Sequence, residues 1–250
     1  MDKKTNFSIA KLNALKKVDF SNKGSFDKPI LDLIQLINNE KALYTTSSCS
    51  GRITLVSCPM EDGSTKKNLK WLLNSHDVVD IEEVLLALEK ATESFKIKFE
   101  PFILHVKCET VKDAQLLQKA AFSSGFKNSG ITFGHRGKHI MCAVRAPSSI
   151  DVPLTDNKGN KMVSDEYISY IVNISNQKMV ENFGKIKRFE ATLIKCIDEL
   201  KNDQTSTKKL KKKEKKDGFK KKYNCSTTEK IQKNTNKVDE CLDDFQFLFA

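Results

Sequence analysis

The chain has 250 residues, of which 39% are hydrophobic and 30% are charged, and its formal net charge is +11. This length is sufficient for one large domain or two small ones with a hydrophobic core. The sequence has no apolar run long enough to cross a bilayer, and no apolar segment typical of a secretory signal near Met1. Membrane proteins and small disulfide-rich secreted domains are therefore excluded. The seven scattered cysteines are expected to be reduced thiols of a cytoplasmic protein.

The positive charge is concentrated toward the C-terminus. Residues 1–200 hold 29 Lys and Arg against 24 Asp and Glu, whereas residues 201–250 hold 14 against 8. Apolar residues also become sparse after residue 200, so we predict a folded domain over residues 1–200 and a disordered Lys-rich tail over residues 201–250. The Lys run is interpreted as a weak nuclear signal, an RNA tether or a solvated tail. The acidic and aromatic end of the tail is either a docking peptide or a frayed terminus.

The predicted secondary structure elements alternate between helices and groups of strands. Each predicted helix follows a residue that can cap its N-terminus and has apolar residues at helical spacing. In chain order the elements are a helix after Asp27, strands at residues 43–48, 53–58 and 69–74, a helix after Asp80, strands within 95–108, a helix after Thr110, strands at 130–133 and 139–145, and a long helix after Ser164. This order predicts an α+β fold, with a mixed β-sheet layered against helices and a long C-terminal helix, and not a doubly wound parallel sheet.

Three polar segments could carry chemistry, and the first runs from Thr45 to Arg52. It contains five hydroxyl groups, a thiol, a glycine and an arginine between two predicted strands. Hydroxyl and backbone N–H groups at a glycine turn can hold an anionic ligand, and Arg52 could bind a carboxylate or phosphate. The alternative is an ordinary Ser-rich hairpin turn. Cys49 has no activating base nearby in the sequence, so we expect a small half-buried side chain and not a nucleophile.

The second polar segment, Ser75-His76-Asp77, follows the strand that contains the single tryptophan, Trp71. Consecutive side chains on a strand alternate faces, so these three residues cannot form a hydrolase triad by themselves. His76 could act as a general base near neutral pH. The alternative is a hydrogen-bonded structural histidine.

The third polar segment, residues 128–139, has glycine turns on both sides of basic side chains. An open backbone beside Arg136 and Lys138 is typical of contacts with RNA phosphates. The alternative is a β-hairpin turn with solvated charges.

Two kinds of site are not supported because their motifs are absent. No Gly-x-Gly-x-x-Gly follows a strand, which argues against a Rossmann nucleotide site. No Cys-x-x-Cys pair and no His-Glu-x-x-His occurs, so we expect no dedicated zinc site and assign no metal ligand.

Several of these stretches occur in the order found in a known family. They are residues 47–53, 71–76, 124–132, Arg145, 152–154 and 176–179. On these motifs the chain resembles the tRNA wybutosine-synthesizing protein 3 family over residues 5–200, which is nearly the whole predicted domain. The Lys-rich tail lies outside the resemblance.

The resemblance implies an S-adenosylmethionine-dependent methyltransferase without a Rossmann fold. It implies methylation of N4 of 7-(3-amino-3-carboxypropyl)-4-demethylwyosine, a modified guanosine next to the anticodon of tRNA(Phe). The expected partner is therefore the anticodon loop of this tRNA, with possible docking to other wybutosine enzymes through the C-terminal tail.

Roles for the polar segments follow from this implied chemistry. Methylation of a ring nitrogen requires removal of its proton, so His76 is the candidate catalytic base, and Arg52 is the candidate clamp for a carboxylate of donor or substrate. The residues expected to bind the cofactor are Ser47, Ser48, Cys49, Ser50, Gly51 and Arg52. The residues expected to bind substrate RNA are Ser75, Gly130, Gly134, His135, Arg136, Gly137 and Lys138. Trp71 and Phe133 could stack on bases, but both are expected in the core.

Two non-catalytic functions fit the same composition. One is a tRNA-binding accessory protein of the wybutosine pathway, and the other is a scaffold that docks wybutosine enzymes through the acidic-aromatic C-terminus.

Overall fold

The computed structural model describes residues 6–16, 26–58, 69–135 and 139–221, with side chains described as far as Asn202. Two compact units are distinguished, Met1–Lys201 and Asn202–Ala250, and the fold below is that of the first unit. Three of the expected RNA-binding residues, Arg136, Gly137 and Lys138, lie outside the described residues, as does the acidic-aromatic end of the tail.

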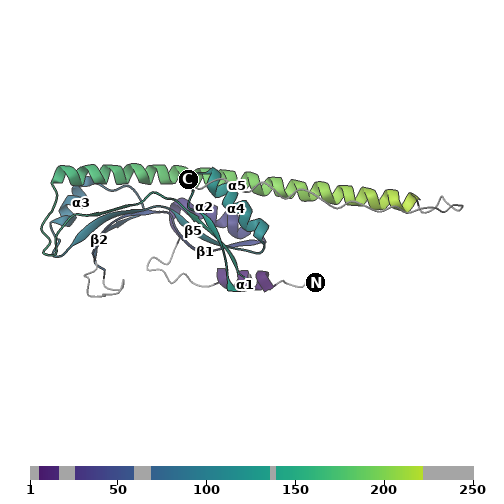
Figure 1. Ribbon diagram of the computed structural model, residues 1–250, viewed down its shortest axis with the longest axis horizontal. Helices are drawn as coiled ribbons and strands as arrows, with labels where there is room; N and C mark the ends of the chain where they lie inside the picture. Colours follow the sequence, from purple (N-terminus) through teal and green to yellow (C-terminus); the bar gives the residue numbers. More distant parts are fainter. Residues whose placement is uncertain (1–5, 17–25, 59–68, 136–138, 222–250) are drawn as a thin grey trace, which may run out of the picture. The chain divides into compact units, whose positions relative to one another are not determined.

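Two four-stranded sheets form the centre of the fold (Figure 1). Sheet 1 has the strand order β1-β5-β7-β6 and sheet 2 the order β3-β2-β4-β8. The strands are β1 (Leu43–Cys49), β2 (Arg52–Ser57), β3 (Trp71–Ser75), β4 (Phe95–Glu100), β5 (Ile103–Cys108), β6 (Gly130–Phe133), β7 (Ile140–Arg145) and β8 (Ile150–Pro153). Every pairing between these strands is antiparallel. The predicted α+β class is confirmed, and the strands that we placed in one sheet form two.

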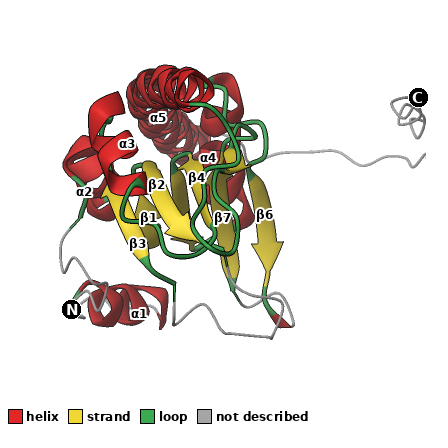
Figure 2. Ribbon diagram, turned by 90° about the vertical axis from the view of Figure 1, so that its left-hand side faces the viewer, coloured by secondary structure: helices red, strands yellow, loops and turns green. Residues whose placement is uncertain are grey.

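Helices lie on both sides of the sheets. They are α1 (Asn6–Leu15), a 3-10 turn at Lys28–Ile30, α2 (Leu31–Asn39), α3 (Ile81–Leu88), α4 (Val111–Ser123) and α5 (Asp165–Lys221). Figures 1 and 2 show α1 on the side of the sheets opposite α5. No helix among the described residues combines the length and apolarity needed to cross a membrane.

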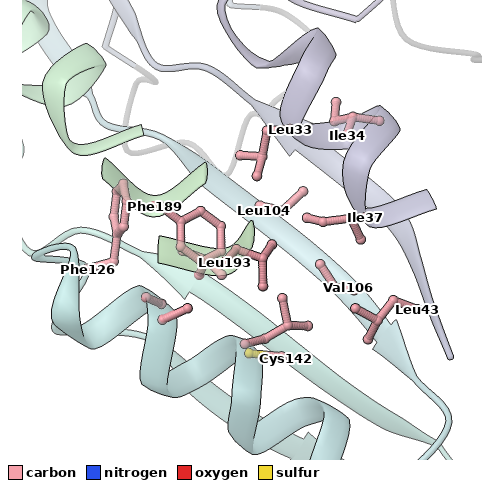
Figure 3. Close-up of a cluster of buried hydrophobic side chains, with 14 of the residues drawn as sticks. Leu33, Ile34, Ile37, Leu43, Leu104, Val106, Phe126, Cys142, Phe189 and Leu193 are labelled. Atoms are coloured by element: carbon pink, nitrogen blue, oxygen red, sulfur yellow. The ribbon is translucent and has the colours of Figure 1, made fainter. Parts of the chain in front are cut away.

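Each sheet packs its apolar face against helices and forms its own core. In the first core, Leu104 and Val106 of sheet 1 meet α2 at Leu33 and α5 at Phe189 and Leu193, as Figure 3 shows. The second core joins sheet 2 to α3 and α5, and its buried residues include Phe95, Ile97, Phe99, Val84, Leu88, Ile168, Val172 and Met179. Burial of one such side chain contributes about 1.5–3 kcal/mol. Helix α5 therefore belongs to both cores.

Three of the predicted helix caps are confirmed and one is wrong. Oγ of Ser164 accepts a 3.3 Å hydrogen bond from the N–H of Tyr167 at the start of α5. Asp80 accepts hydrogen bonds from the backbone N–H groups of Glu82 and Glu83, and Thr110 forms a reciprocal capping box with Asp113. Asp27 makes no capping hydrogen bond to the helical turn that follows it. Its carboxylate accepts instead from the backbone N–H of Ser50, 23 residues further along the chain, at 2.9 Å. A long-range partner has therefore replaced the local one that the sequence offers.

Three elements differ from the expectation. Helix α1 and strand β8 were not predicted, because each is short and has a weak apolar pattern. Helix α5 continues to Lys221, whereas the disordered tail was expected to begin at residue 201. Lys, Glu and Leu have good intrinsic helix propensity, and extending an existing helix avoids the cost of nucleation. The low hydrophobicity of this stretch therefore does not exclude helix.

Candidate functional site

The candidate site lies where the chain passes from one sheet to the other. Strand β1 belongs to sheet 1 and β2 to sheet 2, and only Ser50 and Gly51 separate them. Gly51 has φ +103°, and a Cβ atom there would lie 2.8 Å from Nδ2 of Asn182 and 3.1 Å from the carbonyl oxygen of Glu100. Both the backbone conformation and the close approach require glycine at this position.

Asn182 of α5 ties the two sheets together at this point. Its buried side chain donates a 2.7 Å hydrogen bond to the carbonyl oxygen of Ser50 and accepts one of 2.9 Å from the N–H of Phe102. Ser50 lies between β1 and β2, and Phe102 lies between β4 and β5, so one amide satisfies both crossings between the sheets. Helix α5 thereby fixes the backbone on which the polar residues are placed.

His76 is held against this crossing through one ring nitrogen. Its Nδ1 lies 2.8 Å from the carbonyl oxygen of Gly51, 3.3 Å from Oδ2 of Asp27 and 3.8 Å from Sγ of Cys49. A carbonyl oxygen only accepts, so Nδ1 carries the proton and donates it to Gly51. Among the described residues, every hydrogen bond of the ring is made through Nδ1, which leaves Nε2 as a proton acceptor. The side chain is 25% exposed, so the ring is in part open to solvent.

Asp27, Cys49 and His76 are also the described residues best placed to hold a metal ion, because their ligand atoms lie within 4.8 Å of one another. Two features of the donors oppose this use. The Nδ1 atom that would bind a metal points at the Gly51 carbonyl, and burial raises the pKa of the Cys49 thiol, which disfavours the thiolate. The arrangement is better suited to orienting a histidine next to a buried carboxylate.

Cys49 is half-buried, as expected, but its neighbourhood differs from the expectation. No base was visible near it in the sequence, whereas the fold places the ring of His76 next to its sulfur. Because Nδ1 is occupied by Gly51 and the thiol pKa is raised, the contact does not produce a nucleophilic thiolate.

Arg52, the expected carboxylate clamp, already has a carboxylate partner in the fold. Its Nε lies 2.5 Å from Oε2 of Glu100, and its guanidinium lies over the ring of Trp71 at 5.1 Å. Burial raises the pKa of Glu100, but hydrogen bonds and charge from Arg52 and Lys98 outweigh it and hold this pKa below its usual value. Glu100 is therefore ionised at neutral pH and neutralises much of the charge of Arg52.

A second histidine site lies on the face of sheet 1 that points away from the core. Ser47 on β1 stands opposite His105 on β5, and its Oγ lies 2.9 Å from Nδ1 of His105. On the other side, Nη2 of Arg145 at the end of β7 lies 3.0 Å from Nε2 of the same ring. Burial first, and then the charge of Arg145, lower the pKa of His105 below its usual value. His105 is therefore neutral at physiological pH.

The remaining expected site residues, in β1, at the end of β3 and in the third polar segment, do not gather around either histidine. Ser48 pairs with Leu104 in sheet 1, and Ser75 accepts a 3.1 Å hydrogen bond from the N–H of Asp77 in a local turn. The third polar segment forms the hairpin between β6 and β7, where the N–H of Gly134 donates to the carbonyl of His139. Strand β6 is separated from β1 by β5 and β7, a distance of about 14 Å.

Of the expected RNA-binding residues in this hairpin, His135 is exposed, and a Cβ atom at Gly130 would meet open space. The prediction that Trp71 and Phe133 are core residues is wrong. They are 44% and 57% exposed. Both lie on edge strands, β3 and β6, which have a neighbouring strand on one side only.

Four contributors to the site were missed by sequence reasoning. Arg145 was named in a family motif but given no role at the site. Asp27 was assigned to a helix cap, while His105 and Asn182 were given no role. The alternation of β5 does place His105 on the polar face of its strand. Its pairing with Ser47 depends on the register of β1 against β5, over a separation of 58 residues, which the sequence alone does not provide.

Taken together, the fold and the site define a non-Rossmann α+β protein with an oriented, solvent-accessible histidine at the junction of two antiparallel sheets. A family model described as "Methyltransferase TYW3" matches residues 3–195 of the chain. The chain belongs to this methyltransferase family.

Individual relatives agree with the family. The chain is 40% identical over 237 residues to a tRNA wybutosine-synthesizing protein 3 homolog of Xenopus laevis, covering 92% of this chain and 94% of the relative. It is 36% identical over 179 residues to a protein of Pyrococcus abyssi named tRNA(Phe) 7-((3-amino-3-carboxypropyl)-4-demethylwyosine(37)-N(4))-methyltransferase 2, covering 71% and 82%. The solved structure of PH1069 protein from Pyrococcus horikoshii matches with a TM-score of 0.68 and 35% identity, covering 76% of this chain and 95% of that one.

Proposed function

We propose that this protein transfers a methyl group from S-adenosylmethionine to N4 of 7-(3-amino-3-carboxypropyl)-4-demethylwyosine, beside the anticodon of tRNA(Phe). Membership of the methyltransferase family supports the reaction class, and the name of the Pyrococcus abyssi relative supports the substrate. The observation that carries the proposal is the placement of His76, whose Nδ1 is fixed by Gly51 and whose Nε2 is left as a proton acceptor.

His76 is proposed as the base that removes the proton from the accepting ring nitrogen. The Gly51 carbonyl fixes the tautomer by accepting a 2.8 Å hydrogen bond from Nδ1–H. As the N–C bond to the methyl group forms and the S–C bond breaks, the N4 proton moves to Nε2 of His76. The carboxylate of Asp27, 3.3 Å from Nδ1, stabilises the positive charge that the ring then carries.

The donor set on the outer face of sheet 1 fits S-adenosylmethionine. This cofactor supplies an activated methyl group, so positioning by the protein accounts for much of the catalysis. A carboxylate, which both the donor and the accepting base carry, calls for O–H and guanidinium donors such as those of Ser47 and Arg145 on the same sheet. From the first polar segment, Ser48 and Cys49 continue β1 toward the ring of His76.

The anticodon loop is proposed as the part of the tRNA that is bound. Bases in RNA loops are recognised by stacking on aromatic side chains and by edge contacts. Trp71 and Phe133 are both exposed, and the guanidinium of Arg52 lies over the ring of Trp71, which holds this flat ring in place. Exposed His135 lies two residues after Phe133 and would contact substrate RNA.

Nucleoside mass spectrometry of tRNA(Phe) from a deletion strain tests this function. The expected result is accumulation of the base that lacks the N4 methyl group, restored by the wild-type gene but not by His76→Ala. Normal wybutosine in the deletion strain would refute the substrate assignment. Restoration by His76→Ala would instead support the non-catalytic accessory protein.

The C-terminal segment 239–250 and its docking to other wybutosine enzymes stay a prediction, as does the cytoplasmic location. Deletion of residues 239–250 tests the docking. If the modification profile and the proteins recovered by affinity purification are unchanged, the segment is not an essential dock.

A further inference from the structure

We propose that Ser47 and Arg145 form a carboxylate-binding site and that His105 is the positioning residue that sets its polarity. The inference rests on the proposed function and deepens it, because both the methyl donor and the accepting base carry an α-amino carboxylate. The three residues lie on adjacent strands, with β5 between β1 and β7.

The polarity follows from the chemistry of the three side chains. A guanidinium group only donates hydrogen bonds, so the 3.0 Å contact between Nη2 of Arg145 and Nε2 of His105 makes Nε2 the acceptor. The proton of the neutral ring is then on Nδ1, which donates to Oγ of Ser47 at 2.9 Å. Because Oγ accepts from His105, the hydroxyl proton of Ser47 is turned outward. No described residue accepts that proton.

Arg145 is the arginine that can hold an anion at this site. Its side chain is exposed, and no carboxylate among the described residues forms an ion pair with it. In contrast, Nε of Arg52 is already paired with the carboxylate of Glu100. A neutral His105 uses one N–H of Arg145 without reducing its charge, and the other guanidinium N–H groups stay available. The site therefore offers guanidinium donors and an outward hydroxyl donor, which suits a carboxylate.

The position of this site relative to His76 is suitable for catalysis. Ser47 and Cys49 are two residues apart on β1 and share one face, about 7 Å apart along the strand. Cys49 contacts the ring of His76 at 3.8 Å. A ligand whose carboxylate is bound by Ser47 and Arg145 would therefore extend along β1 toward the candidate base.

The decisive experiment uses ligand pairs that differ by a carboxylate or by the arm that carries it. Binding of S-adenosylmethionine and of decarboxylated S-adenosylmethionine is measured by calorimetry on the full chain, with and without tRNA. A second pair is tRNA(Phe) carrying 4-demethylwyosine with or without the aminocarboxypropyl arm. For the pair whose carboxylate is bound here, the wild type should bind the ligand with the carboxylate more tightly. Arg145→Gln should reduce the affinity for that ligand by about 10- to 100-fold. The affinity for the ligand without the carboxylate should stay unchanged.

The role of His105 is tested by rescue. In His105→Gln the amide oxygen can accept from Arg145 and the amide nitrogen can donate to Ser47, so the polarity is kept and the preference should be largely retained. His105→Leu can do neither and should lose the preference. Lys107→Gln removes a charge from the same face of β5 and is the control for long-range electrostatics.

Two results would overturn the inference. One is unchanged discrimination in Arg145→Gln and Ser47→Ala for both ligand pairs, and the other is equal loss in His105→Gln and His105→Leu with both variants folded. If the variants give either result while the wild type still transfers methyl groups, the carboxylate site is wrong and the proposed function stands. If the wild type neither binds the donor nor modifies tRNA(Phe), the proposed function itself fails.

Discussion

The two histidines of the site have the same tautomer but opposite electrostatic surroundings. His76 donates from Nδ1 to the Gly51 carbonyl and has the Asp27 carboxylate 3.3 Å away. His105 donates from Nδ1 to Ser47 and has the Arg145 guanidinium 3.0 Å from Nε2. A carboxylate favours a positively charged ring, and a guanidinium opposes it. These surroundings agree with the proposed role of His76 as the base, whereas His105 is suited to fix the hydrogen-bond direction between its neighbours.

Their supports differ as well. His105 stands within one sheet, where the ladder of β1, β5 and β7 sets its position. His76 lies at the junction of two sheets and depends on the Ser50–Gly51 crossing, which Asn182 of α5 holds in place. The position of His76 therefore depends on how the two sheets are joined, and the position of His105 depends on the register of β1, β5 and β7. Each prediction below changes one of the two histidine sites and leaves the other intact.

Replacement of the two histidines in parallel is the strongest test of this comparison. His76→Ala removes the proton acceptor, so the saturating single-turnover rate should fall by about 100- to 10,000-fold. Binding of tRNA should change little. His105→Ala should instead raise the donor or tRNA concentration needed for half-saturation. If His76→Ala weakened tRNA binding and left the saturating rate unchanged, His76 would not be the base.

Replacement of Asn182 tests the junction between the sheets without changing the sheet that holds His105. Asn182→Ala leaves the carbonyl of Ser50 and the N–H of Phe102 buried without their partner. We expect the free energy of unfolding in urea to fall by about 2–6 kcal/mol, from about 1–3 kcal/mol for each of the two unsatisfied groups. Asn173→Ala, at an exposed position of the same helix, should change it by less than about 0.5 kcal/mol. A loss no larger than that of the control would show that α5 does not hold the crossing.

Asp27→Asn should sharpen the electrostatic part of the comparison. The new amide oxygen can still accept from the N–H of Ser50, but the negative charge beside His76 is lost. We expect the saturating rate to fall by about 10- to 100-fold because the charged ring is no longer stabilised. Asp32→Asn, an exposed carboxylate on α2, is the matched control. Equal rates in both variants would mean that Asp27 only holds the backbone of Ser50.

Local features of the fold were predictable, and contacts across the chain were not. The caps at Asp80 and Thr110 were found because a cap involves residues within one helical turn. Asp27 looked equally good as a cap, yet its carboxylate bonds to Ser50. A sequence gives no means of ranking a local partner against one that only the folded chain brings near.

The candidate site shows the same division. The polar segments identified Ser47, Cys49 and His76, because they combine chemistry-bearing side chains with strand ends. His105 and Arg145 join Ser47 only through the order β1-β5-β7. That order depends on which strands pair across 58 and 40 residues. The alternation of polar and apolar residues fixes which face a side chain takes, but not which strand lies beside it.

The pH dependence of stability gives the smallest expected effect and the most direct measure of the surroundings of His105. The folded-state pKa of His105 is lowered by burial and by Arg145, whereas the unfolded chain takes up a proton near pH 6.5. Below about pH 6.5 the unfolded state therefore binds a proton that the folded state does not, and stability falls until the folded pKa is reached. In His105→Gln the unfolded chain cannot bind this proton, so this loss of stability at low pH is absent.

The free energy of unfolding in urea, measured at pH 7.5 and 5.5, checks this sign. The stability of His105→Gln relative to the wild type should be higher at pH 5.5 than at pH 7.5, while Lys107→Gln, which keeps His105, should show no such change. An opposite trend would mean that the folded protein prefers a charged His105. In that case Nε2 could not accept from Arg145, and the outward hydroxyl of Ser47 would lose its physical basis.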